Sequence, residues 1–126
     1  MNNCVIALVD DMFFAAKIRG TAERLGIEVI FVRSLFDLQK SVGAKDASLL
    51  IVDLQAQRCD PFAVVESLKS EEHFLKVPVV GFFSHVQTEF QRRALESGVD
   101  YVMPRSVFTK KLPDILQGKL VGDEVE

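Results

Sequence analysis

Ser48-Leu49-Leu50-Ile51-Val52-Asp53 is the stretch that decides the fold of this chain. A short run of aliphatic and β-branched residues is typical of a strand that is buried on both faces. The run ends in a carboxylate, and ligands of parallel α/β sheets bind just outside the carboxyl ends of the strands. Taken alone, Asp53 is better explained as a helix N-cap or a turn residue, because strand-to-helix loops often carry an aspartate. The rest of the chain changes that interpretation.

Strand-like and helix-like segments alternate along the whole chain. Apolar runs predict further strands at residues 4–9, 27–32, 77–83 and 99–103. Helical spacing of apolar residues predicts helices at about residues 14–25, 34–43, 61–69 and 86–97. In the helix at 86–97, we expect Phe90, Ala94 and Leu95 to face the core. Pro113 interrupts the last segment, so we expect a turn near 106–110 and a second helix from 112 or 113 to about 120.

This alternation predicts a three-layer α/β sandwich with a parallel sheet and right-handed crossovers. For a chain of 126 residues, we expect the flavodoxin-like doubly wound (βα)5 fold, with strand order 2-1-3-4-5. The ligand-binding switch point of this fold lies between the first and third strands. Those two strands are followed by Asp10, Asp11 and Asp53. Three carboxylates are therefore predicted to converge at the cleft where this fold binds ligands.

An acidic cluster of this kind needs something that offsets its repulsion. Two carboxylates about 4 Å apart repel by about 4 kcal/mol at an effective dielectric constant near 20. A divalent cation is the simplest offset, and hard oxygen ligands select Mg²⁺. A lysine or arginine in the site is a second possibility, and protonation of one carboxyl group is a third. With Mg²⁺ holding a phosphate, one aspartate can act as a nucleophile toward phosphorus and form an acyl phosphate.

The chemistry-bearing residues, taken together, resemble the receiver domain of bacterial response regulators. The resemblance covers about residues 4–120 and is carried by Asp10-Asp11, Asp53, Ser84 and Tyr101. It implies that Asp53 accepts a phosphoryl group and that Mg²⁺ is held by Asp10, Asp11, Asp53 and the backbone carbonyl of Gln55. It further implies that Ser84 hydrogen-bonds the phosphoryl group and that Tyr101 is the switch residue.

The chain also departs from the pattern of that family. The family places a lysine before a proline at the end of the fifth strand, whereas this chain reads Val102-Met103-Pro104-Arg105. Either Met103 replaces the lysine, or Arg105 lies one residue beyond it and substitutes for it. Phe83 competes with Ser84 for the hydroxyl position, and His85 stands where the family has a small residue. The break at Pro113 falls in the part of the family's fold that signals to partners.

Composition limits the classes of function. The chain is 48% hydrophobic with a net charge of −3, which predicts one soluble domain at residues 1–120 with an acidic tail at 121–126. We expect no nucleic-acid binding, because that needs a basic face. We also expect no membrane span, no secretion signal and a cytoplasmic location. Cys4 and Cys59 match no metal-binding spacing and are expected to be reduced.

Two functional hypotheses remain in front. The first is a phosphorylation switch at Asp53, with a sensor histidine kinase or phosphotransfer protein as donor and an effector protein as target. The second is a degenerate receiver that binds a partner without phosphorylation. A flavodoxin is disfavoured because Asp10-Asp11 would repel its phosphate, and a Mg²⁺ phosphatase because Gln55 stands where it needs a second acid. We expect no enzymatic output.

Overall fold

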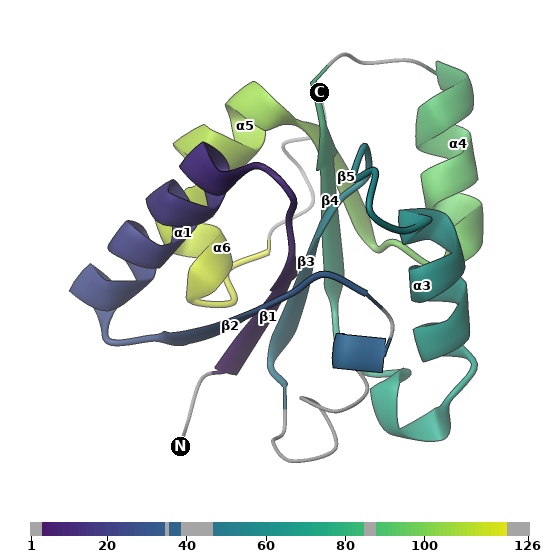
Figure 1. Ribbon diagram of the computed structural model, residues 1–126, viewed down its shortest axis with the longest axis horizontal. Coiled ribbons are helices and arrows are strands. Elements are labelled where there is room, and N and C mark those ends of the chain that lie inside the picture. Colours follow the sequence, from purple (N-terminus) through teal and green to yellow (C-terminus); the bar gives the residue numbers. More distant parts are fainter. Residues whose placement is uncertain (1–3, 35, 39–46, 85–87, 121–126) are drawn as a thin grey trace.

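The protein folds around one parallel β-sheet, as a computed structural model shows for residues 4–34, 36–38, 47–84 and 88–120 (Figure 1). The strands of this part of the chain are β1 (Cys4–Leu8), β2 (Glu28–Val32), β3 (Leu49–Asp53), β4 (Val79–Phe83) and β5 (Tyr101–Pro104). Their order in the sheet is β2-β1-β3-β4-β5, and each neighbouring pair is parallel. The predicted flavodoxin-like fold and its strand order are therefore confirmed.

The central strands of the sheet are buried along their whole length. Every residue of β1, β3 and β4 is buried, whereas the edge strands β2 and β5 are mostly half-buried. This is the burial expected of a parallel sheet that helices cover on both faces. Gly81 in β4 leaves room for Leu54, because a Cβ atom at Gly81 would lie 2.8 Å from Leu54 Cδ1. The sheet is thus tightly packed at Leu54, the residue that follows Asp53.

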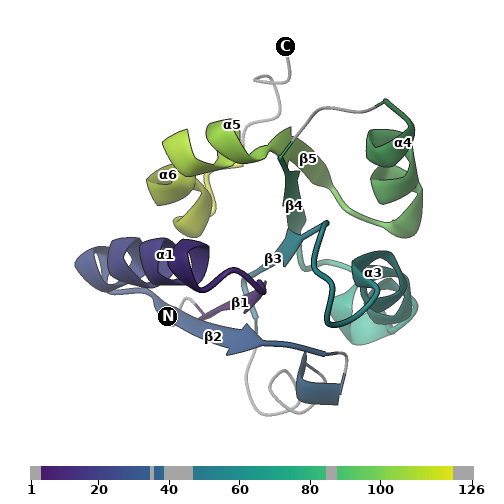
Figure 2. The ribbon, with the colours of Figure 1, turned by 45° about the horizontal axis from the view of Figure 1, so that its top comes forward.

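Helices α1, α5 and α6 cover one face of the sheet, and α3 and α4 cover the other (Figure 2). Their bounds are Met12–Leu25 for α1, Pro61–Lys69 for α3, Thr88–Ser97 for α4, Arg105–Lys110 for α5 and Leu112–Leu116 for α6. Each layer has its own apolar core. The α1 side includes Phe14, Phe82 and Phe108, and the α3 side includes Phe62, Leu68 and Phe83.

The helix boundaries follow the signals in the sequence. Asp60 caps α3, since its Oδ1 accepts hydrogen bonds from the backbone N–H groups of Phe62 and Ala63 at 3.1 and 3.3 Å. Pro61 is the first residue of that helix, where its missing N–H costs nothing. Helix α1 ends at Gly26, whose φ of 71° is a left-handed conformation that glycine adopts without strain.

The division of the last helical segment predicted from Pro113 is confirmed, but the turn expected near 106–110 was wrong, because these residues form helix α5, and α6 ends at Leu116 instead of near 120. Helix α5 ends at Lys110, and α6 begins at Leu112 with Pro113 in its first turn. No helix in the described ranges is long and apolar enough to cross a bilayer. The acidic tail at 121–126, His85 and most of the helix predicted at 34–43 lie outside the described residues.

One prediction about helix α4 was wrong. Leu95 was expected to face the core, but half of its surface is exposed. The residues of α4 that face inward are Phe90, Ala94 and Ser97, which is the i, i+4, i+7 spacing of one helix face. Leu95 lies one position away from that face, and its apolar side chain alone suggested burial.

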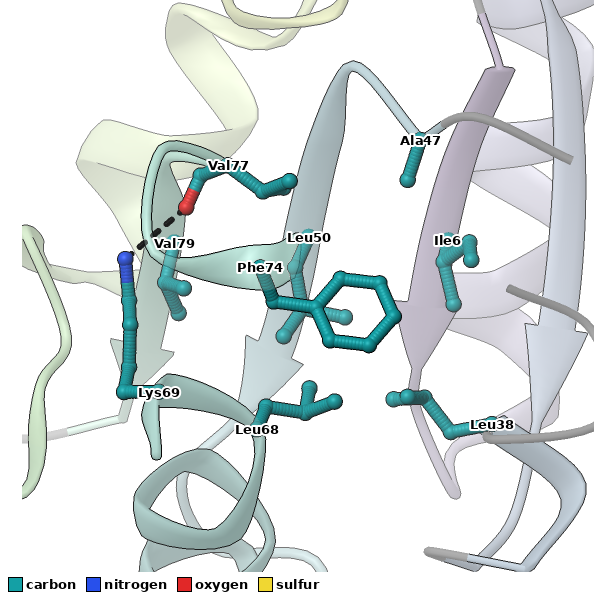
Figure 3. Close-up of a pocket in the computed structure, with 9 residues that line it drawn as sticks. All are labelled: Ile6, Leu38, Ala47, Leu50, Leu68, Lys69, Phe74, Val77 and Val79. Carbon is teal, nitrogen blue, oxygen red and sulfur yellow. Dashed lines mark hydrogen bonds between the residues drawn. The ribbon is translucent and has the colours of Figure 1, made fainter. Parts of the chain in front are cut away.

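A small apolar pocket lies toward the amino ends of the strands, on the α3 side of the sheet (Figure 3). Leu50 and Phe74 contribute to its lining, and the Lys69 side chain lies at its edge. The Lys69 ammonium donates hydrogen bonds to the carbonyl oxygen of Val77 at 2.9 Å and to Asp100 Oδ2 at 3.2 Å. Asp53 lies at the carboxyl end of β3, so the pocket is at the other end of the strands and is not part of the candidate site.

Candidate functional site

The candidate site lies at the carboxyl ends of neighbouring strands. Asp10 and Asp11 follow β1, Asp53 ends β3, Ser84 follows β4, and Arg105 follows β5. The parallel register brings these ends to one edge, since Asp53 pairs with Phe82 and Phe83 pairs with Pro104. These five residues therefore lie at the carboxyl ends of the strands, as expected from the sequence.

Asp53 is a buried carboxylate, with 4% of its surface exposed. Its Oδ1 accepts a hydrogen bond from the backbone N–H of Gln55 at 2.9 Å. Burial raises the pKa of the Asp53 carboxyl above its ordinary value, while the Gln55 hydrogen bond and the Arg105 charge act in the opposite direction. The charges of Asp10 and Asp11 raise this pKa further. Asp53 is thus electrostatically coupled to the rest of the predicted cluster.

Asp11 serves as the N-cap of helix α1. Its Oδ1 accepts hydrogen bonds from the backbone N–H groups of Phe13 and Phe14 at 2.9 and 3.2 Å. Its other oxygen, Oδ2, lies 3.4 Å from Nη1 of Arg105. The Phe14 hydrogen bond is the main cause that lowers the pKa of Asp11, against a smaller effect of burial, and Arg105 lowers it further. Both oxygens of this side chain are therefore already engaged.

Asp10 connects the end of β1 to the loop that follows β3. Its Oδ2 accepts hydrogen bonds from the backbone N–H groups of Gln57 at 2.6 Å and Arg58 at 3.2 Å. This contact spans 47 residues of sequence. Sequence reasoning gave Asp10 a metal-binding role and missed this structural one, for which the sequence carries no local signal.

Arg105 places its guanidinium group inside the acidic cluster. The group lies over the rings of Phe14 and Phe82, at 4.8 and 5.5 Å from their centroids, and contacts Asp11. Met103, the other candidate for the lysine position, packs instead against the apolar core on the α1 side. Within the described part of the chain, the buried Nε of Arg105 has no hydrogen-bond partner. The structure thus brings Arg105, rather than Met103, into contact with Asp11.

Ser84 and Gln55 contact each other across the mouth of the site. The Ser84 hydroxyl donates a hydrogen bond to Oε1 of Gln55 at 2.8 Å, and the Ser84 backbone N–H donates to the same oxygen at 2.8 Å. Phe83 is buried and packs edge-on against Phe90, so its side chain belongs to the core on the α3 side. Ser84 is therefore the residue after β4 that offers a hydroxyl at this edge.

Tyr101 lies in β5, where it pairs with Val80. Its side chain is half-buried against the apolar core on the α1 side. A role for Tyr101 as a switch stays a prediction, because it concerns a change between two states.

The acids have the right chemistry for Mg²⁺, but two of them already contact other groups of the chain. Among the described residues, no three acidic, histidine or cysteine side chains are grouped so that they could hold a metal ion. Asp11 is used by the start of α1 and by Arg105, and Asp10 Oδ2 by the loop after β3. The magnesium site therefore stays a prediction.

Comparison with known proteins identifies the fold of the chain. No protein-family model matches the sequence, and no curated protein matches it. Solved structures of response regulators, in contrast, superpose closely on it. Chemotaxis response regulator CheY4 of Vibrio cholerae has a TM-score of 0.81 at 15% sequence identity, with 95% of this chain and 100% of that chain covered.

Two further solved structures agree with that result. A response regulator from Hahella chejuensis gives a TM-score of 0.81 at 18% identity, covering 99% of this chain and 100% of that one. The phosphorylated cyanobacterial phytochrome response regulator RcpA gives a TM-score of 0.78 at 17% identity, covering 95% and 92%. The chain therefore has the fold of response regulator receiver domains, over nearly its whole length. The resemblance seen in the sequence is confirmed at the level of the fold.

Proposed function

We propose that this protein is a signalling receiver in which Asp53 accepts a phosphoryl group. The observation that carries the proposal is the position of Asp53, buried at the carboxyl end of the central strand β3. Its Oδ1 is held by the Gln55 N–H, while Oδ2 makes no hydrogen bond within the described residues. One oxygen is thus fixed and the other is left to act as nucleophile.

The proposed chemistry is transfer of a phosphoryl group from a phosphohistidine to Asp53. Oδ2 of the ionised carboxylate attacks phosphorus, forming an O–P bond while the P–N bond of the donor breaks. The electron pair of that bond stays on the leaving imidazole nitrogen. The acyl phosphate adds negative charge next to Asp10 and Asp11. Arg105 supplies an opposing charge, and its Nε, which lacks a partner in the described part of the chain, can donate to a phosphoryl oxygen.

Exposed apolar residues beside Asp11 support a protein as the phosphodonor. Met12 is 78% exposed and Phe13 is 90% exposed, although both open helix α1 directly after the acidic pair. Large apolar side chains that are exposed together are typical of protein contact sites. We propose a sensor histidine kinase or phosphotransfer protein as donor and an effector protein as the downstream partner, in the cytoplasm. Under this proposal the protein has no other catalytic activity.

The test is intact-mass spectrometry after incubation with a small-molecule phosphodonor, with and without Mg²⁺. We expect the protein to gain one phosphoryl group and the Asp53→Asn variant to gain none. Asp60→Asn is the matched control, because Asp60 is an acid that caps α3 and lies outside the cluster. Phosphorylation of Asp53→Asn to the same extent, or no gain in the unsubstituted protein, would refute the proposal.

A second candidate is a receiver that binds its partner without phosphorylation. Two contacts favour it: Arg105 occupies Asp11, and Gln55 occupies the Ser84 hydroxyl. In that case Asp53→Asn would leave binding to the effector unchanged, whereas a phosphorylation switch would lose its response to the phosphodonor. A pull-down with each form of the protein separates the two functions.

A further inference from the structure

The acidic cluster already contains a positive charge that belongs to the chain. Arg105 contacts Asp11 Oδ2 through Nη1 at 3.4 Å. The same guanidinium charge lowers the pKa of both Asp11 and Asp53, so its influence extends across the cluster. The sequence left open three ways to offset the carboxylate repulsion: a divalent cation, a lysine or arginine, or protonation of one carboxyl group. The contact between Arg105 and Asp11 is the second of these.

Two buried aromatic rings hold this guanidinium group over the site. Phe14 and Phe82 are 6% and 0% exposed, and their ring centroids lie 4.8 Å apart. Phe82 in turn stacks on Phe108 of α5, at 4.7 Å. A guanidinium group lying on aromatic faces gains from the ring electrons as well as from apolar contact. The two rings therefore help to set the position of the Arg105 side chain, which is itself partly exposed.

We propose that Arg105 takes the place of a divalent cation in this cluster and weakens the binding of Mg²⁺. Asp11 Oδ1 is used by the cap of α1, and Oδ2, the oxygen that remains for a cation, faces the guanidinium group of Arg105. A Mg²⁺ ion would also meet the positive charge of the guanidinium group at short range. Strong Mg²⁺ binding therefore requires Arg105 to withdraw from Asp11.

The buried Nε of Arg105 offsets part of the cost of this withdrawal, which also breaks the contacts with the rings of Phe14 and Phe82. A buried donor without a partner loses its hydrogen bonds to water and gains none in return. Movement of the side chain toward solvent would restore them, which offsets part of the lost contact with Asp11. The inference deepens the proposed function and rests on it for its biological meaning. Its test is separate, because cation binding is measured without any phosphodonor.

The experiment compares Mg²⁺ affinity in the whole protein and in two variants by isothermal titration calorimetry. Arg105→Gln removes the charge and keeps a polar side chain of similar length. Arg19→Gln is the matched control, because Arg19 also stacks on a phenylalanine, Phe31, at 4.7 Å and loses the same charge. We expect Arg105→Gln to bind Mg²⁺ about threefold to fivefold more tightly, the upper part of the range for losing a partly exposed competing ion pair. Arg19→Gln should stay within about twofold of the unsubstituted protein.

Two results would overturn the proposal. One is an unchanged affinity in Arg105→Gln, including no Mg²⁺ binding in either protein. The other is an equal gain in both variants, which would reflect net charge alone. If Arg105→Gln does not fold, nitrogen-15 NMR of the unsubstituted protein gives the answer. Added Mg²⁺ should then shift the Nε resonance of Arg105 and leave that of Arg19 in place; binding of Mg²⁺ with no such shift contradicts the proposal.

Discussion

The Ser84 hydroxyl donates a hydrogen bond to Oε1 of Gln55 at 2.8 Å, which joins the end of β4 to the loop after β3. Both residues were assigned to the site from the sequence, but neither was expected to contact the other. The hydroxyl that is proposed to bind a phosphoryl group therefore has a competing partner. Under the proposed function, the Ser84 hydroxyl would exchange the Gln55 side-chain oxygen for a phosphoryl oxygen when Asp53 is phosphorylated.

This competition predicts opposite effects of two substitutions. Gln55→Ala frees the Ser84 hydroxyl and should raise the phosphorylation rate about threefold, whereas Ser84→Ala removes it and should lower the rate about fivefold. These figures correspond to about 0.7 and about 1 kcal/mol, which lie within the range for one hydrogen bond. The rates are measured by intact-mass spectrometry over time with a small-molecule phosphodonor. Equal rates in the two variants would mean that Ser84 takes no part in the reaction.

The buried carboxyl of Asp53 predicts a dependence of stability on pH. Its pKa is raised in the folded protein, mainly by burial, so the folded state holds this proton more strongly than the unfolded chain. The contribution of Asp53 to stability therefore falls as pH rises from the ordinary value of 3.8 through the raised pKa. We therefore expect Asp53→Asn to be more stable to unfolding than the unsubstituted protein at pH 7.

The measurement is urea unfolding of both proteins between pH 4 and pH 8. The difference between them should shrink toward the acid end, where Asp53 is protonated in the folded protein. A constant difference across this range would show that ionisation of Asp53 has no part in the effect. Asn retains an oxygen that accepts the Gln55 N–H, so this contact is kept in the variant.

The close approach of Gly81 and Leu54 predicts a strong effect of one added methyl group. In Gly81→Ala the new Cβ atom would lie 2.8 Å from Leu54 Cδ1, directly after Asp53. Overpacking of this kind should cost about 1–3 kcal/mol of unfolding free energy. Gly20→Ala is the control, because nothing lies within 4 Å of a Cβ atom at that position in α1. It should stabilise the protein by about 0.5–1 kcal/mol, and thermal unfolding distinguishes the two.

The two functions of Asp11 can be separated by comparison with Asp60. Each caps a helix, but Asp11 also pairs with Arg105. Alanine at either position should cost about 1 kcal/mol of unfolding free energy, and asparagine much less, because it caps almost as well. Asp11→Asn should cost more than Asp60→Asn by up to about 1 kcal/mol, the scale of a partly exposed ion pair.

The pH dependence of that difference gives a further check. The pKa of Asp11 is lowered in the folded protein, chiefly by the Phe14 hydrogen bond. Its stabilising contribution is therefore present above the ordinary value of 3.8 and is lost as pH falls through the lowered pKa. Unfolding experiments at pH 3 and pH 7 should show a smaller cost of Asp11→Asn at the lower pH. The same cost at both would exclude an electrostatic origin.

The fold could be predicted because its information is local. Buried strands such as 49–53 are continuous apolar runs, and the start of α3 is marked by Asp60 and Pro61. The order of the elements along the chain and the right-handedness of crossover connections then allow only a few topologies for the sheet. Leu95 was misplaced because its apolar side chain suggested burial, although it lies one position away from the helix face formed by Phe90, Ala94 and Ser97.

The site was predicted in its position but not in its contacts. Strand ends placed Asp10, Asp11 and Asp53 at one edge, and this needed only the strand order. The pair formed by Arg105 and Asp11 joins residues 94 positions apart, and its geometry depends on how two aromatic rings pack. No spacing in the sequence carries that information.

The ammonium group of Lys69 fixes the amino ends of β4 and β5. It holds the carbonyl oxygen of Val77 and the carboxylate of Asp100, and Asp100 also accepts the backbone N–H of Val79 at 2.8 Å. These hydrogen bonds therefore connect the end of α3 to the segments that precede β4 and β5, at the end of the sheet away from Asp53. We expect a rearrangement triggered at Asp53 to move the carboxyl ends of β4 and β5, while the amino ends of these strands stay fixed by Lys69.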